Sequence, residues 1–143
     1  MITIGNIKSI RVEDYDAVYA IVRSMKRKMQ GVEQLAVLSP SSELFGKYLD
    51  AKRRGDWNST FWSLVYVPEF IAQMDSREAR DALNKLYIAD KRGLNIALVC
   101  FCDDELKCHR SIVAGLLQGV GCNVRAKHDY SVYYRDFLAY VNQ

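Results

Sequence analysis

Six consecutive apolar residues, Ile96–Phe101, constrain the fold of this chain more than any other feature of the sequence. A strand that is apolar at every position must be covered on both faces, which is typical of an interior strand in a parallel sheet. The polar stretch Cys102–Lys107 follows this run, and apolar residues then recur at helical spacing as far as Gly121. The sequence therefore predicts a buried strand, a tight loop and a helix in direct succession.

Shorter patterns before this unit indicate further elements. Ala17–Val22 is almost entirely apolar and predicts a second buried strand, and Leu35–Leu38 predicts another short one. Ser39 and Pro40 have the chemistry of a helix cap and first turn, and Ser76 is a plausible cap for a later helix. We therefore expect helices to begin at these two places.

Apolar stripes follow both predicted caps, as helices that pack on a core require. Pro68 interrupts a helical pattern that starts near Phe61, so we expect either a break or a fresh helix start at the proline. Cys122–Ala126 alternates in the manner of an edge strand, and Tyr133–Val141 suits a C-terminal helix. The stripe residues are Leu44, Phe45, Tyr48 and Leu49 before Gly55, and Ala79, Leu83, Leu86 and Tyr87 before Gly93.

This order of elements predicts an α/β fold with three layers, in which a mostly parallel sheet carries helices on both faces in a Rossmann-like arrangement. The 143 residues match the common size of one domain, so we expect a single domain over residues 1–143. Loops at the carboxyl ends of parallel strands share one edge of the sheet, where open α/β sheets bind ligands. Arg23 and Cys102 are expected at that edge.

Several protein classes are excluded by the composition. Met1–Arg11 lacks the apolar stretch and cleavage site of a signal peptide, and no apolar run is long enough to cross a bilayer. Three of the four cysteines fall within residues 100–108, which is not a secreted disulfide framework, so we expect free thiols and a cytoplasmic protein. The sequence has no dinucleotide-binding fingerprint, P-loop or serine-hydrolase motif. Neither a cofactor nor an oligomeric state can be predicted from the sequence.

The net charge of +3 is a small positive excess, which bears on the classes of ligand and partner that the protein could bind. Lys26–Lys28 and Lys52–Arg54 are basic runs, but acidic residues are scattered throughout, so we interpret the runs as solvated surface. An anionic small molecule or a nucleotide is compatible with this charge. Nucleic acid has little support, and nothing suggests a membrane.

One constellation carries most of the reactive chemistry. Cys108, His109 and Arg110 fall at the start of the predicted helix, where free amides and the helix dipole attract anions. Arg110 suits a carboxylate or phosphate, and Arg23 is expected to face the same anion from a neighbouring strand end. The positive field, with an imidazolium beside it, should lower the pKa of Cys108 and make it a nucleophile. Alternatively, Cys102 acts as a resolving thiol, or is the nucleophile with His109 as its base.

Each of these residues also has a structural interpretation. Cys100 lies inside an apolar strand and is expected to be a small core residue, and Cys122 and His128 are interpreted in the same way. Cysteines buried at helix starts are common, so function and packing are evenly balanced for Cys108. Packing is also the favoured interpretation of three aromatic residues at helical spacing, Trp57, Trp62 and Tyr66.

A metal site is a further alternative. Cys102, Cys108 and His109 are ligand types that lie close together in the sequence. Structural zinc sites pair their ligands in two separate knuckles, and no second knuckle is present. We therefore predict no metal site.

The run Asn95–Cys100, a short acidic loop and then Cys108–Ser111 resembles the domain of unknown function 488 family of bacterial and phage proteins. The resemblance extends from about Ala17 to Gln118. It implies a shared fold and a shared site, but no particular reaction. Many members have an acidic residue where this chain has Cys102, so an acid or base role at that position does not carry over. The family pattern implies as site residues Arg23, Cys100, Cys108, His109 and Arg110.

The first functional hypothesis is a small α/β protein that binds an anionic small molecule, a nucleotide or a nucleic-acid end at the Cys-His-Arg helix start, with or without thiol-based catalysis. The first alternative is a binding or regulatory module without turnover. The second is a structural or partner-binding protein, which would be favoured if these side chains were hydrogen-bonded in the core with no cavity beside them.

Overall fold

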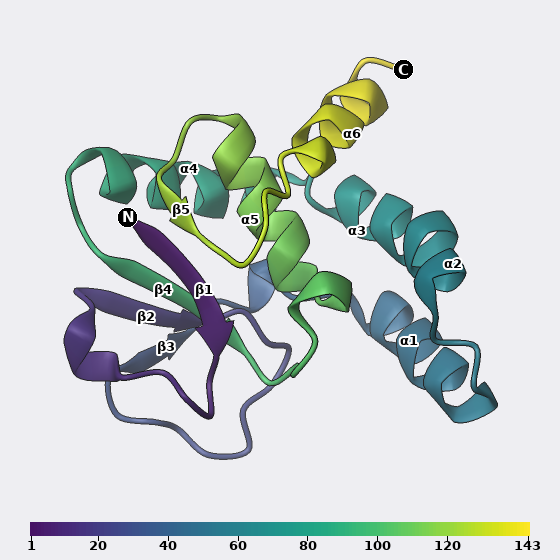
Figure 1. Cartoon of the computed structure of the whole chain (residues 1–143), viewed down its shortest axis with the longest axis horizontal. Helices are drawn as coiled ribbons and strands as arrows, with labels where there is room; N and C mark the ends of the chain where they lie inside the picture. The colour runs from purple at the N-terminus through teal and green to yellow at the C-terminus, as the bar shows by residue number, and fades with distance from the viewer.

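A five-stranded parallel sheet forms the centre of the computed structural model, which describes all of residues 1–143 (Figure 1). The strands are β1 (Ile2–Asn6), β2 (Ala17–Ala20), β3 (Val32–Gln34), β4 (Ile96–Cys100) and β5 (Val124–Arg125). Their spatial order is β3-β2-β4-β1-β5, and every neighbouring pair is parallel. The prediction of a parallel α/β sheet is therefore confirmed.

The helices fill the two connections that cross the sheet from β3 toward β5. Between β3 and β4 lie α1 (Ser42–Arg54), α2 (Ser59–Phe61), α3 (Val67–Gln73) and α4 (Arg77–Lys91); α5 (His109–Gly119) joins β4 to β5, and α6 (Val132–Val141) follows β5. Because these two connections cross in the same direction, right-handed crossovers place their helices on one face. The β1–β2 connection crosses the other way and covers the second face with a 3-10 turn at Val12–Asp14. These layers are consistent with a three-layer α/β fold.

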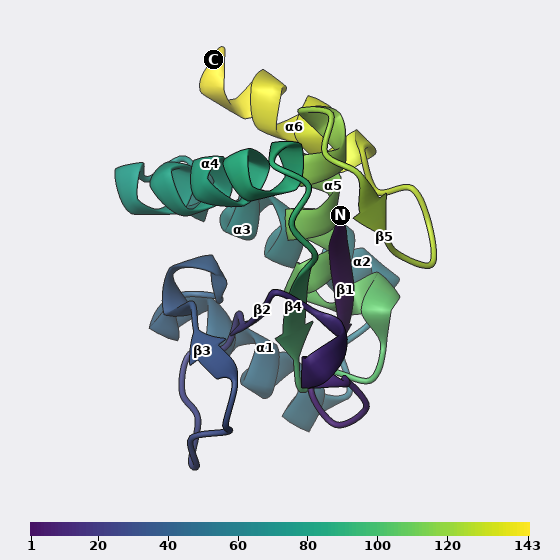
Figure 2. The same ribbon diagram turned by 90° about the vertical axis from the view of Figure 1, so that its left-hand side faces the viewer.

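The central strand β4 is buried at all five positions, as its composition predicts. It lies between β2 and β1, with Val99 opposite Ala20 and Cys100 opposite Asn6 (Figure 2). The strand β1 was not predicted, because Thr3 and Gly5 interrupt its apolar residues. Those two positions are half-buried, so β1 buries fewer side chains than β4.

Two boundaries near the first helix differ from the prediction. Ala36–Leu38 is a 3-10 turn rather than a strand, and the strand β3 precedes it over a more polar segment. The hydroxyl of Ser39 donates to the Ala36 carbonyl (2.5 Å), which uses its side chain in this turn. Ser41 caps α1 instead, by accepting a hydrogen bond from the Leu44 amide (3.1 Å). The predicted start of the helix at Ser39 and Pro40 is therefore two residues too early.

A fresh α-helix, α3, starts beside Pro68 as expected, with the proline in its first turn, but the helical backbone before it is not broken. Helical backbone continues from Ser59 to Gln73, with a wide π turn at Trp62–Tyr66 immediately before the proline. A proline inside a regular α-helix lacks a donor and clashes with the carbonyl four residues earlier. The wider turn changes that geometry and lets the helical backbone continue.

The later helices follow their predictions. Ser76 caps α4 by accepting a hydrogen bond from the Ala79 amide, and Gly93 follows its end with a positive φ of 81°. The helix α5 begins after Cys108, and α6 occupies the C-terminal segment. The alternating segment at residues 122–126 contains β5, although only two of its residues form the strand.

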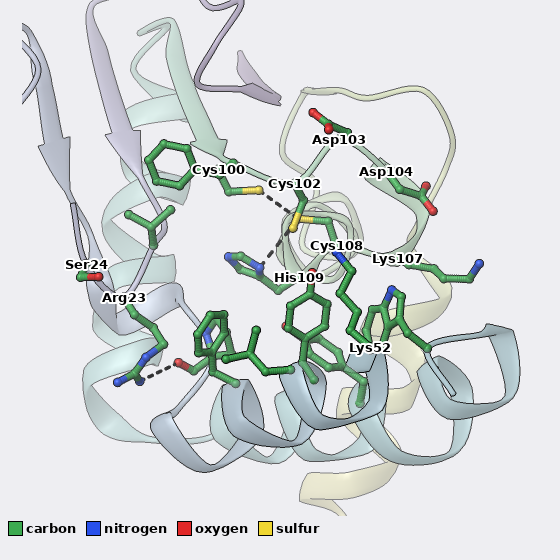
Figure 3. Close-up of a pocket in the computed structure, with 18 residues that line it drawn as sticks. Arg23, Ser24, Lys52, Cys100, Cys102, Asp103, Asp104, Lys107, Cys108 and His109 are labelled. Atoms are coloured by element: carbon green, nitrogen blue, oxygen red, sulfur yellow. Dashed lines mark hydrogen bonds between the residues drawn. The ribbon is translucent and has the colours of Figure 1, made fainter. Parts of the chain in front are cut away.

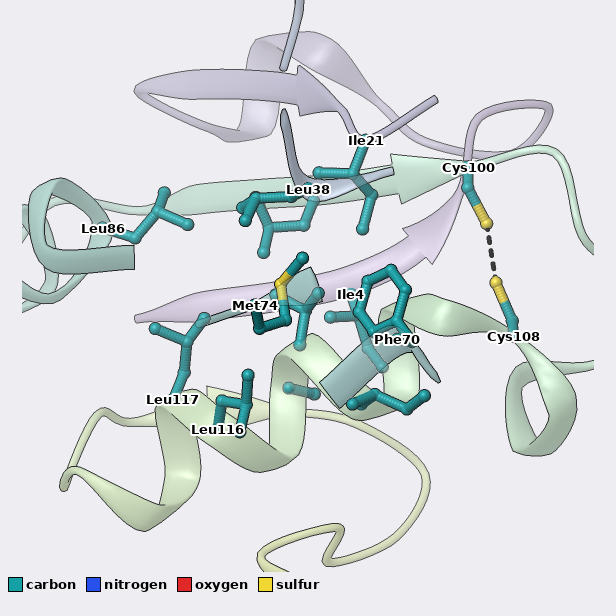
Figure 4. Packing of buried hydrophobic residues seen from close by; sticks show 14 of the residues in the cluster. Ile4, Ile21, Leu38, Phe70, Met74, Leu86, Cys100, Cys108, Leu116 and Leu117 are labelled. Carbon is teal, nitrogen blue, oxygen red and sulfur yellow. Dashed lines mark hydrogen bonds between the residues drawn. The ribbon is translucent and has the colours of Figure 1, made fainter. Parts of the chain in front are cut away.

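The core lies between the sheet and α5, where α3 and α4 contribute further apolar side chains (Figure 4). Leu98, Phe70, Met74 and Leu117 are almost completely buried. Cys100 and Cys108 lie at the end of this same core, next to the carboxyl edge of the sheet (Figure 4). None of the helices combines the length and the apolar character needed to cross a membrane.

Candidate functional site

A cavity of about 660 Å³ opens at the carboxyl ends of β2 and β4 (Figure 3). From β2 the chain proceeds to β3 on one side, whereas from β4 it proceeds toward β5 on the other. The cavity therefore lies where the direction of travel across the sheet reverses, which is the usual ligand site of open α/β sheets. Cys100, Cys102, Cys108 and His109 form one side of it.

The helix α1 and the residue Trp57 form the opposite side. Phe45 and Leu49 are 38% and 50% exposed, although the sequence analysis assigned them to a buried stripe. Both face the cavity, whereas Leu44 of the same stripe packs in the core. The apolar surface of α1 is thus wider than the part that packs on the core, and the apolar residues outside that part line the cavity.

The aromatic residues divide between core and cavity. Trp62 is buried, as predicted, and stacks on Tyr66 with ring centroids 4.9 Å apart. Trp57 and Tyr66 also line the cavity, so packing alone does not describe them. Trp57 meets the edge of Tyr48 at 4.6 Å, which fixes one corner of the aromatic wall.

Three cysteine sulfurs lie together on the strand side of the cavity. The Sγ atoms of Cys100 and Cys108 are 3.0 Å apart, and those of Cys100, Cys102 and Cys108 all lie within 4.8 Å of one another. Cys100 and Cys108 are buried and Cys102 is half-buried. The expectation that Cys100 is a core residue is met, but the side chain also belongs to this sulfur cluster, which the sequence analysis did not predict.

Arg110 supports the sulfur cluster from inside the protein. Its Nη1 donates to Cys100 Sγ (3.0 Å) and to the Cys102 carbonyl (2.6 Å), and lies 3.7 Å from Cys108 Sγ. The side chain is buried, and its Nε has no hydrogen-bond partner. Arg110 does not line the cavity, so the expectation that it brackets one anion together with Arg23 is not met.

Arg23 lies at the rim of the cavity, as expected for the end of β2. Its guanidinium donates to the Pro40 carbonyl (3.1 Å) and to the Ser42 hydroxyl (2.7 Å). Lys52 and Lys107 line other parts of the same cavity (Figure 3). Three cationic side chains therefore border the space, and Arg110 is not one of them.

His109 is neutral and faces Cys108. Its Nε2 lies 2.6 Å from the Ile21 carbonyl, which can only accept, so Nε2 carries the proton. Nδ1 is then an acceptor, 3.7 Å from Cys108 Sγ. Burial lowers the pKa of His109 and keeps the ring uncharged. The predicted imidazolium is therefore disfavoured, and the ring contacts Cys108 rather than Cys102.

The negative charge of the cluster is favoured at Cys100. Hydrogen bonds from the thiols of Cys102 and Cys108, with the charge of Arg110, lower the pKa of Cys100 far below its usual range. The hydrogen bond with Cys100 raises the pKa of Cys102 to about 11, and burial raises that of Cys108. The sequence analysis assigned the activated thiol to Cys108, whereas contacts that only the folded chain shows favour Cys100.

The start of α5 leaves the Cys108 side chain free to join this cluster. Cys108 occupies the cap position with extended backbone and makes no side-chain cap. Its carbonyl accepts from both the amide (2.9 Å) and the hydroxyl (2.8 Å) of Ser111. Cys108, His109 and Arg110 thus come together at a helix start as predicted. They are buried and hydrogen-bonded, as in the structural alternative, but a cavity opens beside Cys108 and His109.

Two other residues lie outside the site. Cys122 packs in the core, in keeping with its structural interpretation. His128 is exposed and meets the ring of Tyr130 at 6.0 Å, so its interpretation as a core residue is wrong. Neither lines the cavity.

Comparison with known proteins gives one match. No curated protein and no solved structure matches this chain. The family model described as "Active DUF488-N3 subclade" matches residues 2–121. This range contains the strands β1 to β4 and every residue of the sulfur cluster. This match confirms the resemblance seen in the sequence, and the chain therefore belongs to the DUF488 family.

Proposed function

We propose that this protein binds an anionic small molecule of the nucleotide class in the cavity at the ends of β2 and β4. The observation that carries the proposal is the combination of aromatic and cationic side chains around one space of about 660 Å³. This volume is typical of small-molecule sites. An aromatic wall suits a planar ring, and cations at the rim suit a phosphate.

The aromatic wall supports a ring-bearing ligand. Tyr48, Trp57 and Tyr66 line the cavity. Each tyrosine ring meets that of Trp57 edge to face, with centroids 4.6 Å away for Tyr48 and 5.5 Å away for Tyr66. Rings that hold each other in place lose little further freedom when a ligand stacks on them. The apolar side chains Phe45 and Leu49 extend the same surface.

The cationic rim supports an anionic group on that ligand. The guanidinium of Arg23 is already oriented by Pro40 and Ser42, and it presents a planar fork suited to phosphate. Lys52 and Lys107 add charge from α1 and from the loop before α5. A small phosphate ester fits this distribution.

A nucleic-acid end is less well supported as the ligand. Arg53 and Arg54 follow Lys52 in a basic run, but both pair with Asp50, and Arg54 also pairs with Asp56. Asp103 and Asp104 line the cavity as well. Such acidic neighbours oppose a long polyanion more than they oppose one phosphate.

A titration that follows tryptophan fluorescence, with Trp57 as the cavity residue that reports on the ligand, tests this proposal. Adenosine monophosphate should quench the emission more strongly than either adenosine or inorganic phosphate, because only the first fills both the aromatic and the cationic parts. Arg23→Ala should weaken binding by about tenfold or more, since a charged hydrogen bond is lost. Arg135→Ala, which removes an exposed arginine outside the cavity, is the matched control and should bind normally. Equal binding by Arg23→Ala, or no binding of any nucleotide, would contradict the proposal.

Thiol-based catalysis on the bound molecule is a second candidate function, favoured by the contact between Arg110 and Cys100 (3.0 Å). A thiolate stabilised by a cation beside a ligand cavity is a nucleophile at neutral pH. The rate of alkylation by iodoacetamide, measured against pH on the chelator-treated chain, tests this candidate. Rapid reaction well below pH 8 would support it, whereas titration near the free-cysteine value would leave a binding module without turnover.

A further inference from the structure

The sulfur cluster offers a set of ligands that the sequence analysis did not assemble. The ligand types that lie close together in the sequence are Cys102, Cys108 and His109, whereas in the structure the third member of the group is Cys100. We propose that Cys100, Cys102 and Cys108 together bind one thiophilic divalent metal ion of the Zn²⁺ type, with Arg110 as the neighbouring counter-charge. This inference does not depend on the proposed nucleotide ligand.

Distances between the sulfurs suit such an ion after a small adjustment. Zinc–sulfur bonds of about 2.3 Å in tetrahedral geometry place sulfurs about 3.8 Å apart. The three Sγ atoms lie within 4.8 Å of one another, and the closest pair, Cys100 and Cys108, is 3.0 Å apart. Shifts of less than about 1 Å in each sulfur–sulfur distance therefore give the geometry that the ion requires.

The local charge also favours a divalent ion. Arg110 is the permanent cation in contact with the cluster, and it offsets one thiolate. A divalent ion supplies two positive charges, so three thiolates, the ion and Arg110 together are neutral. Because cysteines bind such ions as thiolates, binding should release protons.

The cavity provides a route to the cluster and a place for a fourth ligand. All three cysteines line the cavity, while Arg110 approaches two of the sulfurs from the protein side. Three protein ligands with an open position are typical of zinc sites that bind water or substrate. Guanidinium hydrogen bonds to the thiolates would act as outer-sphere support.

Among the three proposed ligands, Cys102 is the one whose replacement should disturb the fold least. It is half-buried and lies in the loop after β4, where its backbone carbonyl is held by both Asn6 (3.0 Å) and Arg110 (2.6 Å). The backbone of this loop is thereby fixed while the thiol faces the cavity. Replacement of Cys102 leaves these backbone hydrogen bonds in place, so it is the best single test.

Cobalt substitution gives a direct readout. The reduced, chelator-treated full chain should bind one equivalent of Co²⁺ and develop an intense near-ultraviolet sulfur-to-metal band, which Zn²⁺ then removes. Cys102→Ser should bind Zn²⁺ at least tenfold more weakly and show a weaker band. Cys122→Ser, which removes a buried thiol outside the cluster, should behave as the native chain does. Release of protons when Zn²⁺ binds, followed with a pH indicator, provides a second measurement.

The proposal is overturned if the native chain develops no sulfur-to-cobalt band, or if Cys102→Ser binds Zn²⁺ as tightly as Cys122→Ser does. Circular dichroism of each variant shows that its fold is retained, and the proton count on the native chain needs no variant at all. Failure here leaves the nucleotide titration unaffected, because the expected result of that experiment depends on Arg23 and not on the sulfur cluster. Failure of the nucleotide titration likewise leaves the cobalt result standing.

Discussion

Glu105 and Arg110 are both buried and lie five residues apart, but their surroundings differ in kind. The Glu105 carboxylate accepts hydrogen bonds from the Lys127 amide (3.0 Å) and from the Tyr130 hydroxyl (2.6 Å). Arg110 instead meets two sulfurs and one carbonyl, and its Nε has no partner. Glu105 lies away from the cavity, whereas the sulfurs that Arg110 contacts line it.

The difference indicates which buried charge is structural. Oxygen and nitrogen partners of good geometry satisfy Glu105 and tie the segment before α6 to the loop before α5. Sulfur is a weaker hydrogen-bond acceptor, so Arg110 is incompletely satisfied by its partners. Its charge is available to stabilise whatever negative charge the sulfurs carry. Burial alone therefore does not separate a stabilising group from a functional one.

The largest effect is expected for Arg110→Met, which removes the cation and leaves the sulfur cluster without its counter-charge. Breaking one side of a buried charged pair costs about 3 kcal/mol or more of the free energy of unfolding. Alkylation of the cluster at pH 7 should also slow by more than tenfold, because the thiolate is no longer favoured. Urea denaturation and iodoacetamide kinetics measure the two effects.

Arg110→Lys is the matched control for this change, because it keeps the charge but loses the planar fork. It should retain more thiolate than Arg110→Met at the same pH. If both variants alkylate as the native chain does, Arg110 is a structural residue and the contrast with Glu105 disappears.

A smaller effect, confined to stability, is expected for Glu105→Gln. Replacing the carboxylate weakens its hydrogen bonds to Lys127 and Tyr130 and should cost about 2 kcal/mol in urea denaturation. The pH profile of alkylation should not change. Tyr130→Phe removes one of the same hydrogen bonds and should show a smaller loss with an equally normal profile. A shifted profile in Glu105→Gln would show that the two buried charges are coupled.

The smallest expected effect is a pH dependence of the free energy of unfolding. Burial keeps the pKa of His109 below its unfolded value, so the unfolded chain binds more protons as the pH falls below about 6.5. Stability should therefore decline between pH 7.5 and 5.5, by at most about 1.4 kcal/mol per pH unit. His109→Gln should remove most of this decline in urea midpoints, while His128→Gln should preserve it. The reverse pattern would assign the titration to the exposed histidine.

The fold was predictable where one segment carries its own signal. The uniform apolar character of β4 and the helical spacing in α5 require no knowledge of distant residues, and both predictions are confirmed. The strand β1 has no such signal, because its glycine and threonine are not apolar strand residues and become half-buried only through packing with the rest of the fold. The edge strand β3 is short and polar, and the sequence placed it a few residues late.

The candidate site was predictable in its location but less so in its contacts. The adjacency of Cys108, His109 and Arg110 marked the helix start that borders the cavity. The direction of each side chain was not available from spacing. Arg110 turns inward to Cys100, and His109 is held by a carbonyl of the chain far before it, at Ile21. Such pairings depend on the register of β2 beside β4, which one sequence does not specify.

The stacked aromatic rings of the Ser59–Gln73 segment restrict the routes by which a proton can reach His109. Tyr66 stacks on Phe70 at 6.3 Å, and Phe70 meets the imidazole of His109 at 5.7 Å. With its Nε2 held by the Ile21 carbonyl, that imidazole is supported from two directions and cannot swing out to solvent. Any proton that reaches Nδ1 must therefore arrive from Cys108 or through the ligand space itself.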